Sequence, residues 1–210
     1  MKVIKKVFNH IRTFKNRREF AMNSVHASDL VVRFTSHCTA QNKYDIVIGK
    51  RCEIKGQLFS FEGGKILIGN NVFMNYNSFI GSMEAVTIGN DVIIATNVRI
   101  FDNNNHPTSP TQREMMSHND FYGELWTWKY AEHKPVVIGD NVWIGGNVVI
   151  NPGVTIGSDV VIASGSVVVK DIPSHVVAGG NPCHVIRQIT DKDKNNWHTQ
   201  LKEYEDDIEK

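Results

Sequence analysis

The sequence lacks long apolar runs and contains little cysteine. No stretch approaches the roughly 20 apolar residues that span a bilayer, and residues 1–20 lack the apolar centre of a secretion signal. Its three cysteines, Cys38, Cys52 and Cys183, are odd in number and widely spaced, which argues against a disulfide framework and against a zinc knuckle. These absences predict a protein of the reducing cytoplasm with no metal.

An excess of charge of either sign is also missing. The 23 Lys and Arg residues face 22 Asp and Glu residues among 210 positions. This balance gives no global attraction for nucleic acid or for an anionic membrane. The length suits one substantial domain with short appendages.

A repeat of six residues is what the sequence has instead. From residue 138 it reads IGDNVW, IGGNVV, INPGVT, IGSDVV and IASGSV. Two positions of the six-residue unit are aliphatic. The second of these positions lies two residues before the first. The first position contains Ile138, Ile144, Ile150, Ile156, Ile162 and Val168, and the second contains Val142, Val148, Val154 and Val160. Similar blocks lie near Ile48, Ile68 and Ile88.

The period of six excludes the common secondary structures as its explanation. An amphipathic helix needs apolar spacings of three and four, and a half-buried strand alternates every two residues. Very short strands joined by Gly-Asn or Gly-Asp corners do give six, because these residues tolerate left-handed backbone angles. The repeat therefore predicts an all-β domain whose parallel coils stack the buried isoleucines in columns.

Residues 135–189 resemble the bacterial hexapeptide-repeat acyltransferases, which include galactoside, maltose, nodulation-factor and virginiamycin-type acetyltransferases. The resemblance extends over about residues 46–189. It implies a left-handed parallel β-helix, acetyl-CoA as co-substrate, a sugar-like acceptor, and a homotrimer with the acyl-CoA cleft between neighbouring subunits. The handedness follows from the resemblance alone.

Three parts are expected along the chain. Residues 1–45 form a helical cap, residues 46–189 form the β-helix with an inserted loop at 101–135, and residues 190–210 form a C-terminal helix. The N-terminal segment is basic with an apolar helical face that includes Val7, Ile11 and Phe14. We interpret it as covering the open first coil, with a membrane surface as the less favoured alternative.

Acyl transfer to a hydroxyl needs a base, and histidine is the natural one at neutral pH. The segment IFDNNNHPTSP places His106 where the repeat ends and the insertion begins, and the resemblance carries the catalytic role onto this His-Pro pair. His118 is the alternative base. Asp102, Glu114, Glu124 or a backbone carbonyl could orient the imidazole.

Candidate acceptor-binding residues lie in the β-helix and in the insertion. By resemblance, Asn75 in FMNYN contacts the acceptor, and its alternative role is that of a corner residue. Aromatic side chains of the insertion could stack on a sugar ring or anchor the loop to the coil. Those predicted to bind the acceptor are Tyr122, Trp126 and Trp128.

The acetyl-CoA site is expected on the later coils. Small corner residues let backbone groups approach a narrow pantetheine arm. By resemblance, Trp143 flanks the reacting centre and small residues line the arm, with Lys170 and Arg187 as anchors for the phosphates. The small residues are Gly145, Gly146, Ala163 and Ser164.

The predicted function is O-acetyl transfer to a hydroxyl of a carbohydrate such as a capsule, O-antigen or oligosaccharide sugar. One alternative is N-acetyl transfer to an amino sugar or an antibiotic. Another is a non-catalytic or metal-binding β-helix scaffold, which would need histidines converging from adjacent coils. No histidine stands between Pro135 and Ser174.

Overall fold

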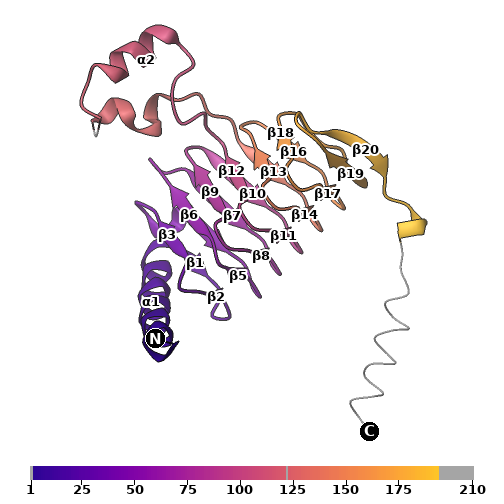
Figure 1. The fold of residues 1–210 in the computed structure, drawn as a ribbon, viewed down its shortest axis with the longest axis horizontal. Helices are drawn as coiled ribbons and strands as arrows, with labels where there is room; N and C mark the ends of the chain where they lie inside the picture. The colour runs from indigo at the N-terminus through magenta and orange to yellow at the C-terminus, as the bar shows by residue number, and fades with distance from the viewer. Residues whose placement is uncertain (1, 122, 194–210) are drawn as a thin grey trace.

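The computed structural model describes residues 2–121 and 123–193. Short parallel strands wind around the three sides of a prism (Figure 1). Sheet A contains β1 (Val25–His26), β4 (Ile46–Ile48), β7 (Lys65–Ile68), β10 (Ala85–Ile88), β13 (Val136–Ile138) and β16 (Thr155–Ile156). Sheet B contains β2 (Val31–Val32), β5 (Glu53–Ile54), β8 (Phe73–Met74), β11 (Ile93–Ile94), β14 (Trp143–Ile144), β17 (Val161–Ile162), β19 (Val176–Gly179) and β20 (His184–Gln188).

Sheet C completes the prism. It contains β3 (His37–Thr39), β6 (Gln57–Ser60), β9 (Phe79–Ser82), β12 (Arg99–Phe101), β15 (Val149–Ile150) and β18 (Val167–Val168). One circuit through sheets A, B and C is a coil, and we number the coils from coil 1 (β1–β3) to coil 6 (β16–β18). All sheet pairs are parallel except β19 with β20, so the prediction of a left-handed parallel β-helix is confirmed.

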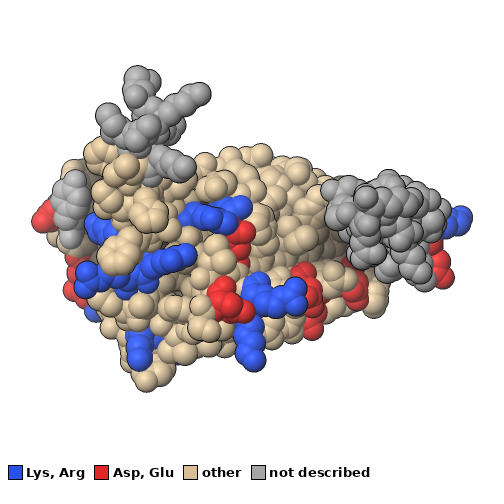
Figure 2. Space-filling view, turned by 90° about the horizontal axis from the view of Figure 1, so that it is seen from below, with Lys and Arg blue, Asp and Glu red and all other residues tan. Residues whose placement is uncertain are grey.

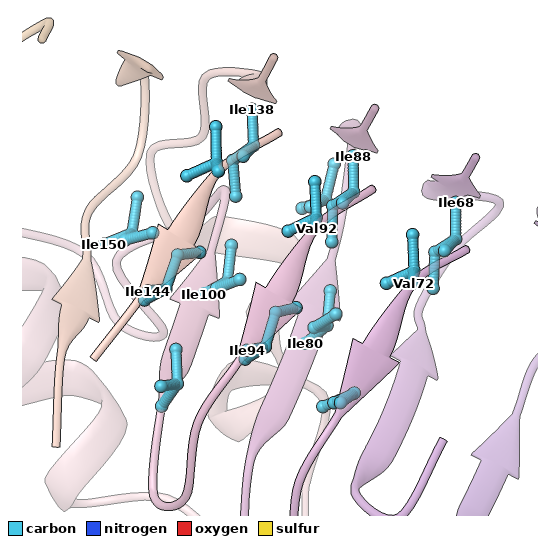
Figure 3. Packing of buried hydrophobic residues seen from close by; sticks show 14 of the residues in the cluster. Ile68, Val72, Ile80, Ile88, Val92, Ile94, Ile100, Ile138, Ile144 and Ile150 are labelled. Atoms are coloured by element: carbon cyan, nitrogen blue, oxygen red, sulfur yellow. The ribbon is translucent and has the colours of Figure 1, made fainter. Parts of the chain in front are cut away.

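The repeat of six places its aliphatic residues in the centre of the prism, as predicted. Ile138, Ile144 and Ile150 are at most 1% exposed and point inward from sheets A, B and C (Figure 3). Each is paired in register with an isoleucine of the preceding coil, Ile88, Ile94 or Ile100 respectively. The core is thus a set of aliphatic columns that run along the axis.

The corners use asparagine and glycine differently from our expectation. The left-handed backbone angle falls on the third corner residue, for example Asn141 (φ +54°) or Asp159 (φ +58°). The glycine that opens the corner is needed for close stacking, because a Cβ on Gly139 would lie 2.8 Å from the backbone carbon of Gly157. Asparagine therefore provides the turn and glycine provides the space between coils.

The parallel coils begin earlier than the boundary expected at residue 46. Coil 1 already pairs with coil 2, since Val25 and His26 lie in register with Val47 and Ile48. Its inward positions are occupied by residues such as Val32 and Cys38 rather than isoleucine, so the repeat pattern is weak there. The β-helix in this chain therefore starts at Val25.

A helix covers the open end of coil 1. In α1 (Lys2–Asn23), Phe20 is buried, Glu19 Oε1 accepts from the Cys38 backbone N–H at 2.6 Å, and Asn23 Nδ2 donates to the Cys38 carbonyl at 2.8 Å. The earlier turns of α1 expose Phe8 and Phe14. None of the described helices is long and apolar enough to cross a membrane.

The other irregular parts are the insertion and the C-terminal end. The insertion carries α2 (Pro110–Ser117), η2 (Glu124–Trp126) and η3 (Trp128–Tyr130), and it projects from the coil in Figure 1. Two further short turns are η1 (Lys43–Asp45) and η4 (Asp191–Asp193). The C-terminal helix expected at 190–210 lies almost wholly outside the described residues.

Candidate active site

Asp102 locks the corner from which the insertion leaves the coil. Its fully buried carboxylate accepts from Ser82 Oγ at 2.7 Å and from the backbone N–H groups of Met83 and Glu84 at 2.8 Å each. Asn103 Nδ2 adds a fourth donor at 3.1 Å. These donors occupy the carboxylate, so Asp102 is not the partner of the His106 ring that the sequence suggested.

The His106 ring is exposed just beyond this corner. It packs edge to face on the indole of Trp126, with ring centroids 5.7 Å apart at 79°. The ring forms no hydrogen bond with any residue of 2–121 or 123–193, so the described residues provide no partner for either nitrogen. The backbone N–H of His106 donates to the Asn104 carbonyl at 2.7 Å.

Neither of the other carboxylates predicted to orient His106 forms a hydrogen bond or an ion pair with the ring. Glu124 pairs with Lys129, and Glu114 lies on α2. Trp126 holds the ring instead, and its own Nε1 donates to the Met116 carbonyl on α2 at 2.9 Å. His118, the alternative base, forms the C-terminal cap of α2.

Trp128 anchors the insertion to sheet C, which is the alternative role that the sequence left open beside acceptor binding. Its indole lies edge to face with Phe59 at 5.1 Å and with Phe101 at 5.9 Å between ring centroids. The indole sits over Gly81, where a Cβ would lie 2.7 Å from Trp128 Cη2. Tyr122, also predicted to bind the acceptor, lies outside the described residues.

This aromatic anchor was missed from the sequence. Phe59, Gly81 and Phe101 occupy one column of sheet C, in register from coil to coil. Their spacing of about one coil was the sequence signal that these three residues stack. Nothing in a single sequence indicates that a tryptophan of the insertion would pack above the glycine.

In each of the six coils, the residue that follows the sheet B strand belongs to one row, which we call the B–C edge. In coil order it consists of Arg33, Lys55, Asn75, Ala95, Gly145 and Ala163. Backbone hydrogen bonds join successive coils here, for example from Asn75 N to the Ile94 carbonyl and from Gly145 N to the Ile162 carbonyl. The edge changes from long polar side chains in the early coils to small side chains from Ala95 onward.

The predicted pantetheine-binding residues lie together on this edge or directly after it. Gly145 is required by the stacking itself, because a Cβ there would lie 2.6 Å from Ser164 N. Gly146 is different, since the nearest atom to its added Cβ would be Thr96 O at 3.4 Å. The Gly146 N–H donates to Ser164 Oγ at 3.1 Å, and Ala163 lies beside them. Gly146 therefore leaves open surface that a slender ligand could use.

Trp143 lies on the outer face of sheet B, in register with Ile93 and Val161. Its side chain is 54% exposed and borders a groove of ≈ 690 Å³ that also involves His175 and Ile189. An exposed tryptophan beside exposed Ile93 makes this face apolar. Such a face suits contact with a ligand or with another subunit.

The two predicted phosphate anchors differ in availability. Lys170 follows β18, is exposed, and has no ion-pair partner within the described residues. Arg187 on β20 holds Asp193 with both guanidinium nitrogens, at 2.7 and 3.0 Å, and this pairing lowers the pKa of the Asp193 carboxyl to about 2. A phosphate would have to compete with Asp193 for Arg187.

A single chain does not gather all the predicted residues. Asn75 is half-buried on the B–C edge, where its Oδ1 accepts from the Tyr76 backbone N–H at 2.9 Å, as a corner residue would. His106 follows sheet C and stands on the opposite edge of that sheet. The base and the small-residue edge are thus separated by the width of sheet C.

Comparison with known proteins identifies the family. A model of the bacterial transferase hexapeptide, with six repeats, matches residues 135–170. Galactoside O-acetyltransferase of Escherichia coli strain K12 is 41% identical over 157 residues, which cover 75% of this chain and 69% of that protein. The chain belongs to the hexapeptide-repeat acetyltransferases. It is therefore an acyltransferase that depends on acetyl-CoA, as the sequence predicted.

Solved structures of this acetyltransferase family agree with the assignment. A galactoside acetyltransferase in complex with coenzyme A is 32% identical with a TM-score of 0.60, covering 89% of this chain and 84% of that one. The polySia-specific acetyltransferase NeuO is 26% identical with a TM-score of 0.64, covering 84% and 72% respectively.

Proposed function

We propose that this acetyltransferase transfers the acetyl group of acetyl-CoA to a hydroxyl of a carbohydrate, with His106 as general base. The observation that carries the proposal is the exposed His106 ring, held by Trp126 at the root of the insertion. The galactoside and polysialic acid specificities in the names of its relatives support a sugar acceptor. A cytoplasmic location would suit the supply of acetyl-CoA.

In the proposed reaction, a ring nitrogen of His106 takes the proton of the acceptor hydroxyl while that oxygen attacks the thioester carbon. The backbone N–H of Ser164, which lies beside Gly145, would stabilise the tetrahedral oxyanion. When the intermediate collapses, the carbon–sulfur bond breaks and the imidazolium returns its proton to the CoA sulfur. The products are an acetyl ester and free CoA.

We propose a homotrimer in which His106 of one subunit meets the B–C edge of the next. Two observations support it: a single chain separates these groups, and Trp143 and Ile93 present an apolar face on sheet B. Mass measurement by light scattering tests the trimer. Mixing His106→Ala with Gly146→Trp subunits tests the shared site, because only mixed trimers would combine one intact base with one intact edge.

An acceptor panel tests the proposed reaction. Purified protein with acetyl-CoA should release thiol in proportion to sugar that gains the mass of one acetyl group. The product should lose that group in mild base, as an ester does. A base-stable product formed only with amino sugars would favour N-acetylation instead, and thiol release without acetylated sugar would contradict both.

A further inference from the structure

A basic cavity lies between α1 and the early coils. It has a volume of ≈ 500 Å³, and α1 contributes His10, Phe14 and Arg17 to its wall. The coils contribute Arg33 and Lys55 of the B–C edge, together with the aromatic rings of Phe34 and Tyr76. Lys and Arg side chains gather at this N-terminal end of the molecule in Figure 2.

The charges that line this cavity are unbalanced. Among the residues that the structure describes, three cations face it, Arg17, Arg33 and Lys55, and no carboxylate belongs to its wall. Glu53, which is not part of the wall, pairs with Arg33 at 2.7 Å and approaches Lys55 at 3.6 Å. Arg17 has no ion-pair partner among the residues the structure describes. The cavity therefore carries positive charge that the described residues do not neutralise.

Lys55 is held firmly at this wall. Its side chain is only 16% exposed, and its ammonium lies 4.4 Å from the ring centroid of Phe73 and 5.1 Å from that of Tyr76. Contact with two ring faces fixes the ammonium and removes much of its water. A cation that has already lost water gives a stronger charge-assisted hydrogen bond to an incoming anion.

The position of the cavity relates it to the proposed reaction. Lys55 stands one coil before Asn75 on the B–C edge and three coils before Gly145. At about 4.8 Å per coil, the ammonium end of the edge and its small-residue end are about 14 Å apart. An acceptor seated at the basic end could direct a hydroxyl toward a thioester that approaches from the small-residue end.

We propose that the acceptor is an anionic sugar, whose carboxylate or phosphate binds Arg17, Arg33 and Lys55 in this cavity. The aromatic rings of Phe34 and Tyr76 would pack on the apolar face of the sugar ring. This assignment of substrate class rests on the proposed acetyl transfer. The anion-binding property of the cavity does not depend on it.

Calorimetry without acetyl-CoA tests the cavity directly. The probes are galactose, galacturonic acid and galactose 6-phosphate, together with the matching glucose series. A charge-assisted contact should make at least one acid or phosphate bind about tenfold more tightly than its neutral parent, and added salt should weaken that binding. The two anionic arms distinguish a carboxylate site from a phosphate site.

The double variant Arg17→Gln with Lys55→Met should remove this preference. Arg12→Gln is the matched control, because Arg12 is exposed on the same helix but does not line the cavity. Equal binding of neutral and anionic sugars by the wild-type protein would overturn the inference. So would a preference that survives in the double variant.

Acetylation kinetics separate this inference from the function on which it rests. The wild-type enzyme should favour the anionic acceptor in kcat/KM, and the double variant should keep its KM for acetyl-CoA. A large rise in that KM would assign the cavity to the CoA phosphates and overturn the proposal. Tight binding of anionic sugars with no acetylation would instead contradict the proposed reaction and leave the anion site standing.

Discussion

The coils before the insertion and those after it share one core but differ in length. Ile48, Ile68 and Ile88 lie in register at steps of 20 residues, whereas Ile138 and Ile156 are 18 residues apart. The extra residues lie where sheet C turns toward sheet A, so the aliphatic columns continue without a break. The inward residues must therefore stay in register from coil to coil, whereas the corners between the sheets can gain or lose residues.

Most features of the candidate site lie in coils that are longer than 18 residues, or next to them. The insertion with His106, the aromatic anchor of Trp128 and the basic side chains on the B–C edge all belong to the longer, earlier coils or to their boundary. The later coils supply the small residues of the same edge. The regular later coils thus provide an edge of small residues along which a ligand can lie. The insertion and the longer early coils provide the candidate base and the charged side chains that could select the acceptor.

The largest effect is expected from charging the shared core. Ile150→Asp would place a carboxylate without a partner in an aliphatic column, at a cost of several kcal/mol. Val137→Asp is the control, because Val137 belongs to the same coil but is 40% exposed. Thermal unfolding should show a large loss for the first variant and little change for the second. Equal stability of the two would contradict the stacked core.

Removing the proposed base should break function without breaking the coils. His106→Ala should lower kcat by about 10² to 10⁴, the usual worth of a general base. Its unfolding temperature should stay close to the wild-type value because the ring is exposed. His118→Ala should reduce kcat far less. If His118→Ala had the large loss of kcat and His106→Ala the small one, His118 would be the base.

Releasing the insertion from the coils should have an intermediate effect. Trp128→Ala removes the aromatic anchor, and Gly81→Ala fills the space under the indole. Both variants should become more sensitive to protease within the insertion and lose about 10-fold to 100-fold in kcat through misplacement of His106. Normal turnover in both would mean that the insertion is held by other contacts.

The two kinds of corner glycine should differ in stability by a smaller amount. Gly139→Ala forces atoms of adjacent coils apart and should cost about 1–3 kcal/mol. Gly165→Ala meets no atom of the described residues within 4 Å, so the backbone angle of φ +76° is what opposes the change, at about 1–2 kcal/mol. Denaturant unfolding measures both. A costlier change at Gly165 would reverse our account of the corners.

The smallest effect is expected at the exposed phosphate anchors. Lys170→Ala should raise the KM for acetyl-CoA severalfold at low salt, and the difference should shrink as salt is added. Asp193→Asn should lower that KM, because it frees Arg187 from a pair that persists down to about pH 2. If neither variant changes the KM, the phosphates bind elsewhere.

The sequence by itself determined the core and the place of the candidate base. A period of six assigns every sixth residue to the inside of a coil, and this is a local property, so the burial of Ile138, Ile144 and Ile150 could be predicted. The repeat also marks the place of His106, directly after a block ends, but the role of base was assigned to it from the family resemblance of the His-Pro pair. Weak repeats, as in coil 1, were correspondingly harder to delimit.

Only the tertiary structure decided which distant side chains meet. Asp102 turns away from His106 to Ser82, Trp128 fills the gap over Gly81, and Lys55 faces Arg17 across a cavity. Each of these contacts depends on the number of residues per coil and on the path of α1 or the insertion. A change of two residues in coil length changes which outer residues stack on one another. The periodic pattern therefore predicts which residues are buried, but it does not predict which outer side chains pair.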